Sequence, residues 1–340
     1  MVYILQILIL LLGVGSTIAG PYSSATEDLG HPIDPGVPGY IGPDGPGVVS
    51  PNNRVNPQFV AWASRVVNYT PADGLDTEWS DPMRALGPVS ANQFDIVSLG
   101  ELDGPSITNG LAPGKITLAF DLAIADGPGA DFAIFENGFE LTADEHFAEL
   151  AYVEVSTDGE VFARFPTQSL TPNPVPFTLG TIDSSDVYNL AGKHSNFDLS
   201  VSWGTPFDLG TLTNAPANVD INDIRFVRLI DIPGNGDFVD SSTPPLPIYD
   251  VWPTVGSGGF DLEAIGVINH RIDVQLTPGQ GCAFFAQTNR TYQVQFTATL
   301  NPPDWQPLGV PVTGDNQMHQ RTIPSLPANT RFYYRLAVDP

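Results

Sequence analysis

Glycine and proline interrupt this chain so often that a fold built on long helices is excluded. The sequence has 33 glycines and 33 prolines in 340 residues. Proline removes a backbone donor and glycine favours turns, so the segments between them are short. Apolar residues in these segments recur with period two or in short continuous runs, which is typical of β-strands. The sequence therefore predicts an all-β fold.

Short apolar runs separated by turns continue to about residue 269. The clearest of them begin at Lys115, Asp131, Ala148, Val161, Asp223 and Phe260. One turn is explicit, because Asp158-Gly159 follows an alternating run and predicts a type I′ hairpin. Just before these runs, residues 56–74 supply apolar anchors that favour a short helix or turn docked on the core. Strands at this spacing without helical periods between them predict a β-sandwich.

A second, smaller unit is expected after Asn269. Its runs, including CAFFAQ, TYQVQFTATL and RFYYRLAV, indicate six or seven short strands, enough for a minimal immunoglobulin-like sandwich. The sequence thus divides into a signal peptide, a Pro/Gly-rich leader, a large β domain and a small β domain, with boundaries at 1–19, 20–55, 56–269 and 270–340.

The first residues predict export. An apolar run from Ile4 to Leu12 is followed by small residues and by Thr17-Ile18-Ala19, which suits cleavage after Ala19. The alternative is a retained membrane anchor. No later apolar run is long enough to span a bilayer, so we expect no membrane insertion after cleavage and a secreted, extracellular protein.

Charge narrows the range of partners. The chain carries 38 acidic and 13 basic residues, a formal net charge of -25. Such a surface repels phosphate backbones and therefore argues against nucleic acid and anionic membranes as partners. Short aspartate side chains instead suit Ca²⁺, which prefers hard oxygen ligands.

Cys282 is the only cysteine, so no disulfide can form within the chain. It lies in the apolar run CAFFAQ, where we expect a small core side chain. The alternative is a disulfide between two chains.

Acidic and amide side chains stand in the turns and at the strand ends. Because calcium takes six to eight oxygens, its ligands must come from several loops. The candidate metal ligands are Glu136, Asn137, Asp208, Asp231, Asp237, Asp250 and Asp261. Glu136 ends the apolar run DFAIFE, so its carboxylate requires compensation, from a metal ion or from amides of the SGGFD turn. The alternative for the set is that turn Asp and Asn residues only cap backbone amides.

A second group of residues suits a sugar or an anion. Trp203, Tyr249 and Trp252 lie in turn-rich segments close to Asp and Asn, and the AGKH motif places Lys193 beside His194. Flat aromatic faces near carboxylates are typical of a glycan-binding surface, so polysaccharide or surface glycan is the predicted partner. The alternatives are aromatic side chains that close one end of the sandwich and a lysine that pairs with a neighbouring acid.

The sequence does not favour catalysis. Its histidines, His31, His146, His194, His270 and His319, lack zinc spacing. There is no G-x-S-x-G motif. Glutamates such as Glu149 and Glu154 could supply a pair of acids for glycoside hydrolysis, but their place on or beside a strand favours salt bridges or solvent exposure. We predict a protein that is not an enzyme; an extracellular hydrolase is the alternative.

Several phrases, taken in order over residues 56–269, resemble a known family. They are RALGPVSANQFDIVSLGELDG, ITLAFDLAIADGPGADFAIFENGF, AYVEVSTDGEVFARF, NLAGKH, GTPFDLG and PIYDVWPTVGSGGFDLEAIGVIN. Together they are similar to exported bacterial cell-surface proteins with a galactose-binding-like (discoidin-like) jelly-roll domain. The tail resembles a fibronectin type III-like domain.

The resemblance implies a jelly-roll β-sandwich followed by a smaller fibronectin-like one, secreted or displayed at the surface, with no established chemistry. The resulting hypothesis is a non-catalytic module that binds glycan or extracellular matrix and contains a structural calcium. The alternative is an architectural surface protein that self-associates.

Overall fold

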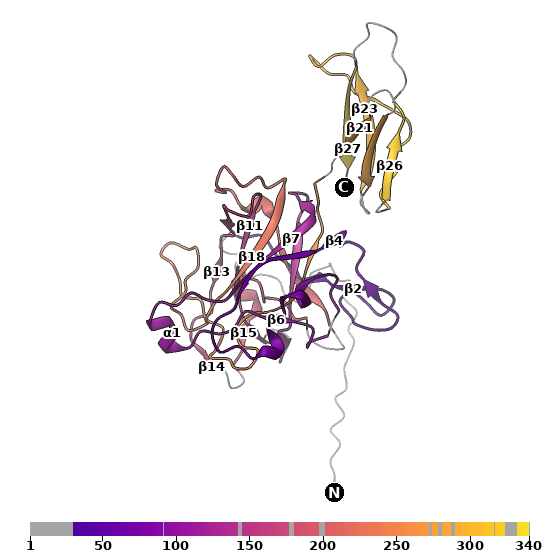
Figure 1. Cartoon of the computed structure of the whole chain (residues 1–340). Helices are drawn as coiled ribbons and strands as arrows, with labels where there is room; N and C mark the ends of the chain where they lie inside the picture. Colours follow the sequence, from indigo (N-terminus) through magenta and orange to yellow (C-terminus); the bar gives the residue numbers. More distant parts are fainter. Residues whose placement is uncertain are drawn as a thin grey trace.

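The computed structural model describes residues 30–339 except for 91, 142–144, 177–179, 197–200, 272–273, 278–280, 287–289, 316 and 324–331. The signal peptide expected at residues 1–19 lies outside this part of the chain. The described chain is mostly β, in several antiparallel sheets (Figure 1).

The first main sheet has five antiparallel strands in the order β12-β11-β18-β7-β5. Their bounds are Arg65–Thr70 for β5, Lys115–Ile124 for β7, Ala151–Ser156 for β11, Ala163–Arg164 for β12 and Ile224–Asp231 for β18. In β18 Val227 and Leu229 are buried while Arg228 between them is partly exposed, so the period-two pattern turns one face inward.

The second main sheet follows the order β1-β17-β8-β20-β4, with β6 also paired to β20. The bounds are Val37–Pro38 for β1, Ala61–Trp62 for β4, Val97–Ser98 for β6, Phe132–Glu136 for β8, Trp203–Phe207 for β17 and Asp261–Val267 for β20. Every residue of β8 and β20 is buried, which explains their unbroken apolar runs.

The two sheets face each other across one apolar core. Ile116, Val153 and Leu229 of the first sheet belong to the same cluster as Phe132 and Ile265 of the second. Full burial of such a side chain contributes about 1.5–3 kcal/mol. Successive long strands alternate between the sheets, with β7, β11 and β18 in one and β8, β17 and β20 in the other. The result is a sandwich-like architecture, as the spacing of the strands predicts.

Two segments differ from the sequence prediction. Residues 61–62 and 65–70 form strands β4 and β5 rather than the expected short helix or turn. Part of the expected leader also joins the main body, because Val37 and Pro38 pair with Gly204 and Trp203 of β17. Apolar periodicity gave no signal for β1 because a two-residue strand is too short to show one.

The hairpin at Asp158-Gly159 is present, since β11 pairs with β12, but its turn is wider than predicted. Ser156 ends one strand and Ala163 starts the next. The Asp158 carboxylate accepts hydrogen bonds from the amides of Glu160 and Val161, at 2.8 and 2.9 Å, and this stabilises the longer loop.

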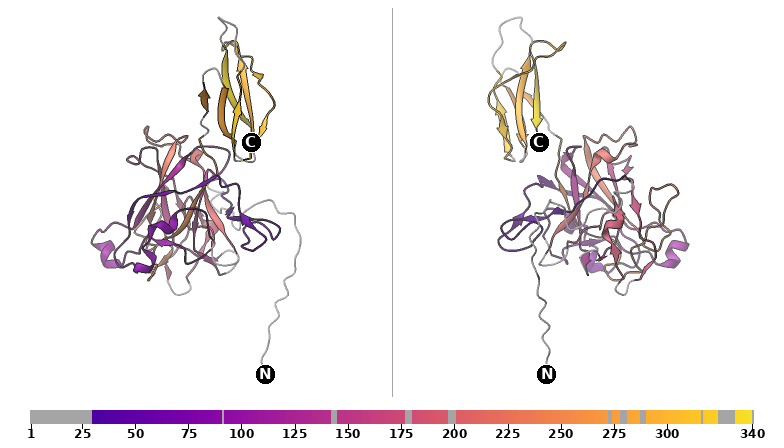
Figure 2. Two further views of the ribbon diagram at one scale, coloured as in Figure 1. Left: turned by 45° about the vertical axis from the view of Figure 1, so that its right-hand side comes forward. Right: turned by 180° about the vertical axis from the view of Figure 1, so that it is seen from behind.

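The C-terminal strands form two further sheets around a separate core, and Figure 2 shows them as a distinct block. The strand bounds are Gln275–Thr277 (β21), Gly281–Ala286 (β22), Thr291–Thr297 (β23), Gln306–Pro307 (β24), Val312–Thr313 (β25), Gln317–Arg321 (β26) and Tyr333–Asp339 (β27). Cys282 is buried in this core beside Phe284 and Val294, which confirms the prediction of a small core side chain.

The remaining elements are short. The strands are Tyr40–Ile41 (β2), Arg54–Val55 (β3), Phe139–Glu140 (β9), Glu145–Phe147 (β10), Gln168–Ser169 (β13), Val175–Pro176 (β14), Ile182–Asp183 (β15), Val187–Tyr188 (β16) and Val251–Trp252 (β19). The helices are Thr77–Trp79 (η2), Pro82–Ala85 (η3), Gly104–Thr108 (α1), Ser184–Asp186 (η4) and Leu209–Thr211 (η5). Over the described residues, no helix has the length and apolar character needed to cross a bilayer.

Candidate metal centre

Acidic residues end or begin strands of both main sheets at the same end of the sandwich. Glu136 is the last residue of β8, and it pairs with Leu262, which follows Asp261 at the start of β20. Asp231 is the last residue of β18 and pairs with Ala151, the first residue of β11. Because these strands are antiparallel, their acidic ends meet at one edge of the core.

Six carboxylates gather there, and we call them the carboxylate cluster: Glu101, Glu136, Glu149, Asp231, Asp250 and Asp261. All are buried except Glu101, which is partly exposed. Their charges repel one another: Asp261 raises the pKa of both Glu136 and Glu149, and Glu101 raises that of Asp250.

Backbone amides hold one side of the cluster. The amide of Phe260 donates to Asp231 Oδ1 at 2.8 Å, and that of Gly259 donates to Glu149 Oε1 at 3.1 Å. Gly259 has φ +80°, and a Cβ there would lie 2.6 Å from the carbonyl oxygen of Gly100. Only glycine therefore lets the SGGFD turn approach the carboxylates this closely.

Four buried carboxylate oxygens have no hydrogen-bond partner among the described residues. They are Glu101 Oε1, Glu136 Oε2, Asp231 Oδ2 and Asp261 Oδ1. None of the ion pairs found in the described part of the chain joins a lysine or arginine to the cluster. An unpaired buried carboxylate is costly, so these oxygens require a proton or a cation.

His146 is a basic side chain close to Glu136. A Cβ added to Gly138 would lie 2.5 Å from His146 Nε2 and 2.6 Å from Glu136 Oε2, so both atoms face that glycine. Burial lowers the pKa of His146 to about 3. The imidazole is therefore uncharged at neutral pH and does not neutralise the cluster.

Without a cation, carboxyl groups of the cluster are protonated near neutral pH. Burial, with added repulsion from Asp231, raises the pKa of Glu101 to about 9. Burial likewise raises the pKa of Asp261 to about 8 and that of Asp231 to about 7. Several of these groups therefore keep protons at pH 7 that a divalent cation would displace.

Glu154 shows how the same protein compensates a buried acid elsewhere. Its side chain is buried on β11, and Arg164 Nε donates to it at 2.9 Å while Arg228 Nε donates at 2.6 Å. Two guanidinium groups thus neutralise one carboxylate. The cluster has six carboxylates and no such partner within the described chain.

A pocket of about 160 Å³ opens beside the cluster. Glu149 and Asp261 of the cluster line it, together with Asn137, Phe139, Phe147, Thr254, Val255, Ser257 and Gly258. Phe139 and Phe147 lie on the paired strands β9 and β10, and their rings stack with centroids 4.9 Å apart. The pocket lining therefore combines two aromatic rings with several side-chain oxygens.

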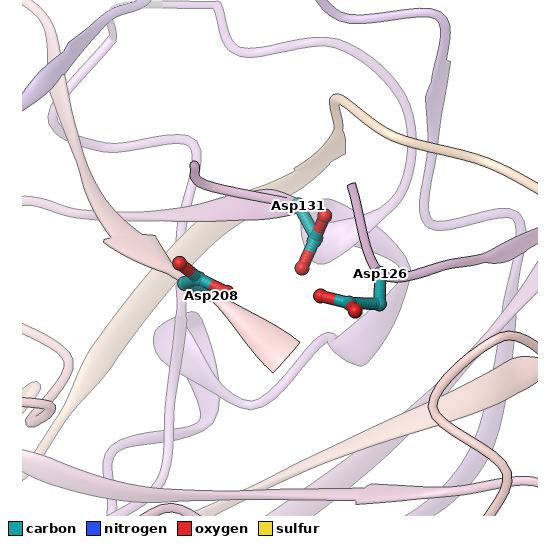
Figure 3. Close-up of side chains that lie close together, drawn as sticks. All are labelled: Asp126, Asp131 and Asp208. Atoms are coloured by element: carbon teal, nitrogen blue, oxygen red, sulfur yellow. The ribbon is translucent and has the colours of Figure 1, made fainter. Parts of the chain in front are cut away.

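A second acidic group, the aspartate triad of Asp126, Asp131 and Asp208, could hold a metal ion. One carboxylate oxygen from each lies within 4.8 Å of the others, and among the described residues only these three meet that spacing. Figure 3 shows the three side chains around a common space. Asp131 precedes β8, so the triad and the carboxylate cluster lie at opposite ends of that strand.

The buried member of the triad is already satisfied. Asp131 Oδ2 accepts a hydrogen bond from the amide of Leu209 at 2.7 Å. Asp131 Oδ1 accepts from the amide of Gly127 at 2.8 Å and from Asn269 Nδ2 at 2.7 Å. Asp126 is exposed to water. The triad therefore has the spacing of an ion site without unpaired buried oxygens.

The seven predicted metal ligands separate into several places. Glu136, Asp231, Asp250 and Asp261 belong to the carboxylate cluster, and Asn137 lines its pocket. Asp208 belongs to the triad. Asp237 is exposed in a turn, where its carboxylate accepts from Asn235 Nδ2 at 2.7 Å.

Sequence reasoning missed Glu101, Glu149, Asp126 and Asp131 as members of these groups. The sequence suggested that Glu149 was a salt-bridged or exposed strand residue. The one sequence feature that could have placed it in the cluster is its position just before a buried strand. Asp131 begins the apolar run that Glu136 ends, so one strand carries an acid at each end.

The five predicted ligand-binding residues are dispersed, and none lines the pocket beside the cluster. Lys193 is fully buried and paired with Asp34, and the His194 ring lies 3.0 Å from the carbonyl oxygen of Asp34. Trp203 packs against Gly47.

The other two aromatic residues also pack on neighbouring chain. Tyr249 lies against Gly236, where a Cβ would approach its ring to 2.3 Å. Trp252 Nε1 donates to the carbonyl oxygen of Leu102 at 3.0 Å. These contacts favour the alternative in which the aromatic side chains close the end of the sandwich.

Comparison with known proteins adds no relative: no protein-family model and no curated protein matches the chain.

Proposed function

We propose that this protein is an exported, non-catalytic binding module whose carboxylate cluster holds calcium. The observation that carries the proposal is the set of four buried carboxylate oxygens without hydrogen-bond partners, in a cluster that no ion pair among the described residues joins to a lysine or arginine. A divalent cation would neutralise two charges at once and supply the missing partner for each oxygen.

Calcium suits the cluster better than magnesium. Calcium accepts six to eight oxygens in irregular geometry, whereas magnesium demands a near-ideal octahedron and keeps its waters. The cluster offers six carboxylates from six separate segments, which is an irregular set. No three of their oxygens lie within 4.8 Å of one another. Calcium binding would therefore draw the carboxylate side chains closer together.

The proposal also includes the fold of each domain and the relation to exported cell-surface proteins. The alternation of strands between two facing sheets supports a jelly-roll main domain, and the seven C-terminal strands around their own core support a fibronectin type III-like domain. Relation to exported bacterial cell-surface proteins rests on the sequence phrases alone. In such a module the ion would fix the loops at one end of the sandwich for binding or display.

Calorimetric titration tests the proposal. The purified chain is depleted of metal with EDTA, exchanged into chelator-free buffer at pH 7.5, and titrated with CaCl₂ and separately with MgCl₂. We expect saturable calcium binding with release of protons, because the ion displaces protons from carboxyl groups of raised pKa. Magnesium should bind at least tenfold more weakly.

Two matched variants locate the ion. Asp261→Asn changes the carboxylate cluster and should weaken calcium binding at least tenfold. Asp126→Asn makes the same type of change in the triad and should leave calcium binding unaltered. Calcium binding that responds only to the triad variant would contradict the assignment to the cluster, and absence of calcium binding in the wild type would contradict the proposal itself.

A further inference from the structure

We infer that Lys193 and Asp34 form an isopeptide cross-link, in which the lysine Nζ is joined to the aspartate Cγ as an amide. The two side chains are in direct contact, with Lys193 Nζ donating to Asp34 Oδ1. This modification lies outside the carboxylate cluster and does not depend on the proposed calcium site.

Both reacting side chains are removed from water. Lys193 is fully buried, and Asp34 is 8% exposed. A dry environment favours the neutral amine and the carboxylic acid over the ion pair, because charges are costly in the interior. Burial lowers the pKa of Lys193 and raises the pKa of Asp34, so both shifts favour the forms that can react with each other.

An ion pair leaves this buried contact poorly satisfied. A lysine ammonium has three N–H donors, but within the described chain Lys193 Nζ has one hydrogen-bond partner, Asp34 Oδ1. Asp34 Oδ2 is buried and has no hydrogen-bond partner among the same residues. An amide retains one N–H and one carbonyl oxygen, so the cross-link would remove the hydrogen-bonding groups that lack partners.

The backbone holds both side chains in place. Ala191 and Ala151 exchange two hydrogen bonds, of 3.0 and 3.2 Å, which fix the segment just before Lys193 against β11. His194 Nε2 lies 3.0 Å from the carbonyl oxygen of Asp34, and the strand β1 that follows Asp34 pairs with β17. Well-oriented groups within one molecule reach effective molarities of about 10⁵–10⁸ M, which accelerates their condensation.

The reaction is a condensation without any change of oxidation state. The lone pair of the neutral Lys193 Nζ attacks Cγ of the Asp34 carboxylic acid, and a bond forms between nitrogen and carbon. The bond between Cγ and Oδ2 then breaks. Oδ2 leaves as water, with its own proton and one proton from the nitrogen, and Oδ1 remains as the carbonyl oxygen of the amide.

A cross-link of this type suits the composition of the chain. Cys282 is the only cysteine, so no disulfide can form within the chain. Asp34 lies in the Pro/Gly-rich segment, 159 residues before Lys193, so the amide would tie this segment covalently to the main domain. A cross-link that closes so long a loop strongly restricts the unfolded chain.

Mass spectrometry of the mature wild-type chain tests this inference. We expect an intact mass that is lower than the mass of the sequence by one water molecule. Trypsin cuts after arginine and lysine, but not after a lysine whose Nζ is part of an amide. A digest of the denatured chain should therefore give a branched peptide, in which the peptide ending at Arg54 is joined to residues 165–225.

Two aspartate variants provide the matched control. Asp34→Ala removes the acid, so the chain should have its full sequence mass and trypsin should cut it after Lys193. Asp44→Ala makes the same change at an exposed position of the same segment and should leave the water deficit and the branched peptide unchanged.

Three outcomes would overturn the inference. The first is a wild-type chain of full sequence mass that trypsin cuts after Lys193. The second is a chain that lacks one water molecule but is still cut after Lys193, because the water would then have been lost elsewhere. The third is a branched peptide that persists in Asp34→Ala, because Lys193 would then be joined to a different acid. Each of these results leaves the calcium proposal unaffected.

Discussion

The two ends of strand β8 carry two groups of acidic residues that differ in oxygen spacing and in hydrogen bonding. At its start, the aspartate triad has three carboxylate oxygens within 4.8 Å of one another, and its buried member Asp131 accepts three hydrogen bonds. At its end, the carboxylate cluster lacks that spacing but contains buried oxygens without partners. The triad therefore has the oxygen spacing of an ion site, whereas the cluster has buried carboxylate oxygens that an ion would stabilise.

Buried carboxylate oxygens without partners are a stronger indication of a bound ion than close spacing of exposed carboxylates. Water screens an exposed aspartate such as Asp126, so a few close carboxylates at a surface cost little. An uncompensated ion in the interior costs several kcal/mol even after relaxation. Side chains can rotate to shorten oxygen distances, but they cannot leave the core. Calcium is therefore expected at the cluster first.

The largest expected effect is that of calcium on the wild type. An ion at a hundredfold excess over its dissociation constant stabilises the folded chain by about 2.7 kcal/mol. For a domain of this size that corresponds to a rise of about 5–10 °C in melting temperature. Scanning calorimetry at pH 8 in CaCl₂ and in EDTA measures it. Identical melting curves would mean that the cluster holds no ion.

Glu136→Gln should remove roughly half or more of that calcium shift, because the variant loses one anionic ligand. In calcium the variant should melt below the wild type. In EDTA at pH 8 it should melt at or above the wild type, because burial raises the pKa of the Glu136 carboxyl and its burial therefore costs free energy that the neutral amide avoids. A variant that melts lower by the same amount in both buffers would reduce Glu136 to a packing role.

The dependence of stability on pH in the absence of calcium should have a definite sign. The folded-state pKa values of Asp231, Asp261 and Glu101 are raised to about 7, 8 and 9. Unfolded carboxyl groups titrate near 4, so between about pH 4 and 9 the folded chain binds more protons than the unfolded chain. Without calcium, stability should therefore fall as pH rises through this window.

Melting temperatures in EDTA from pH 5 to 9 measure that slope. Glu101→Gln should flatten it above pH 7, because this change removes the carboxyl group with the pKa of about 9. A stability that rises steadily from pH 5 to 9 would contradict the assignment of protons to the cluster.

The smallest effect is expected at the triad. Asp126→Asn changes an exposed side chain, so the melting temperature should shift by less than about 1 °C, in calcium or in EDTA. Thermal melts in both buffers measure it. If this variant abolishes the effect of calcium on the melting temperature, the ion binds at the triad and not at the carboxylate cluster.

Much of the fold could be predicted from the sequence, because it depends on local patterns. Alternation in IRFVRLID and unbroken apolar runs such as DFAIFE predict half-buried and fully buried strands. The tiny strand β1 and the wide turn at Asp158 could not be predicted, since their partners lie far away or depend on side-chain hydrogen bonds.

The candidate site was harder to predict for the same reason. Glu136, Asp231, Asp250 and Asp261 stand at strand ends, which sequence can locate. Glu149 joins them only because β11 begins opposite the end of β18. The prediction of aromatic ligand-binding residues selected two tryptophans and a tyrosine in turns. The aromatic residues that line the pocket are Phe139 and Phe147, whose strands are too short to be recognised from sequence.

The edge strands of the two main sheets affect whether copies of this chain can polymerise by strand addition. The second main sheet ends in the two-residue strands β1 and β4, and the first ends in the two-residue β12 on one side. Borders this short offer few free backbone groups to a neighbouring molecule. Only β5 presents a longer border, and it carries Arg65 and Asn68 facing outward. Strand addition between copies is therefore disfavoured at three of the four edges of the two main sheets, and β5 is the edge most open to it.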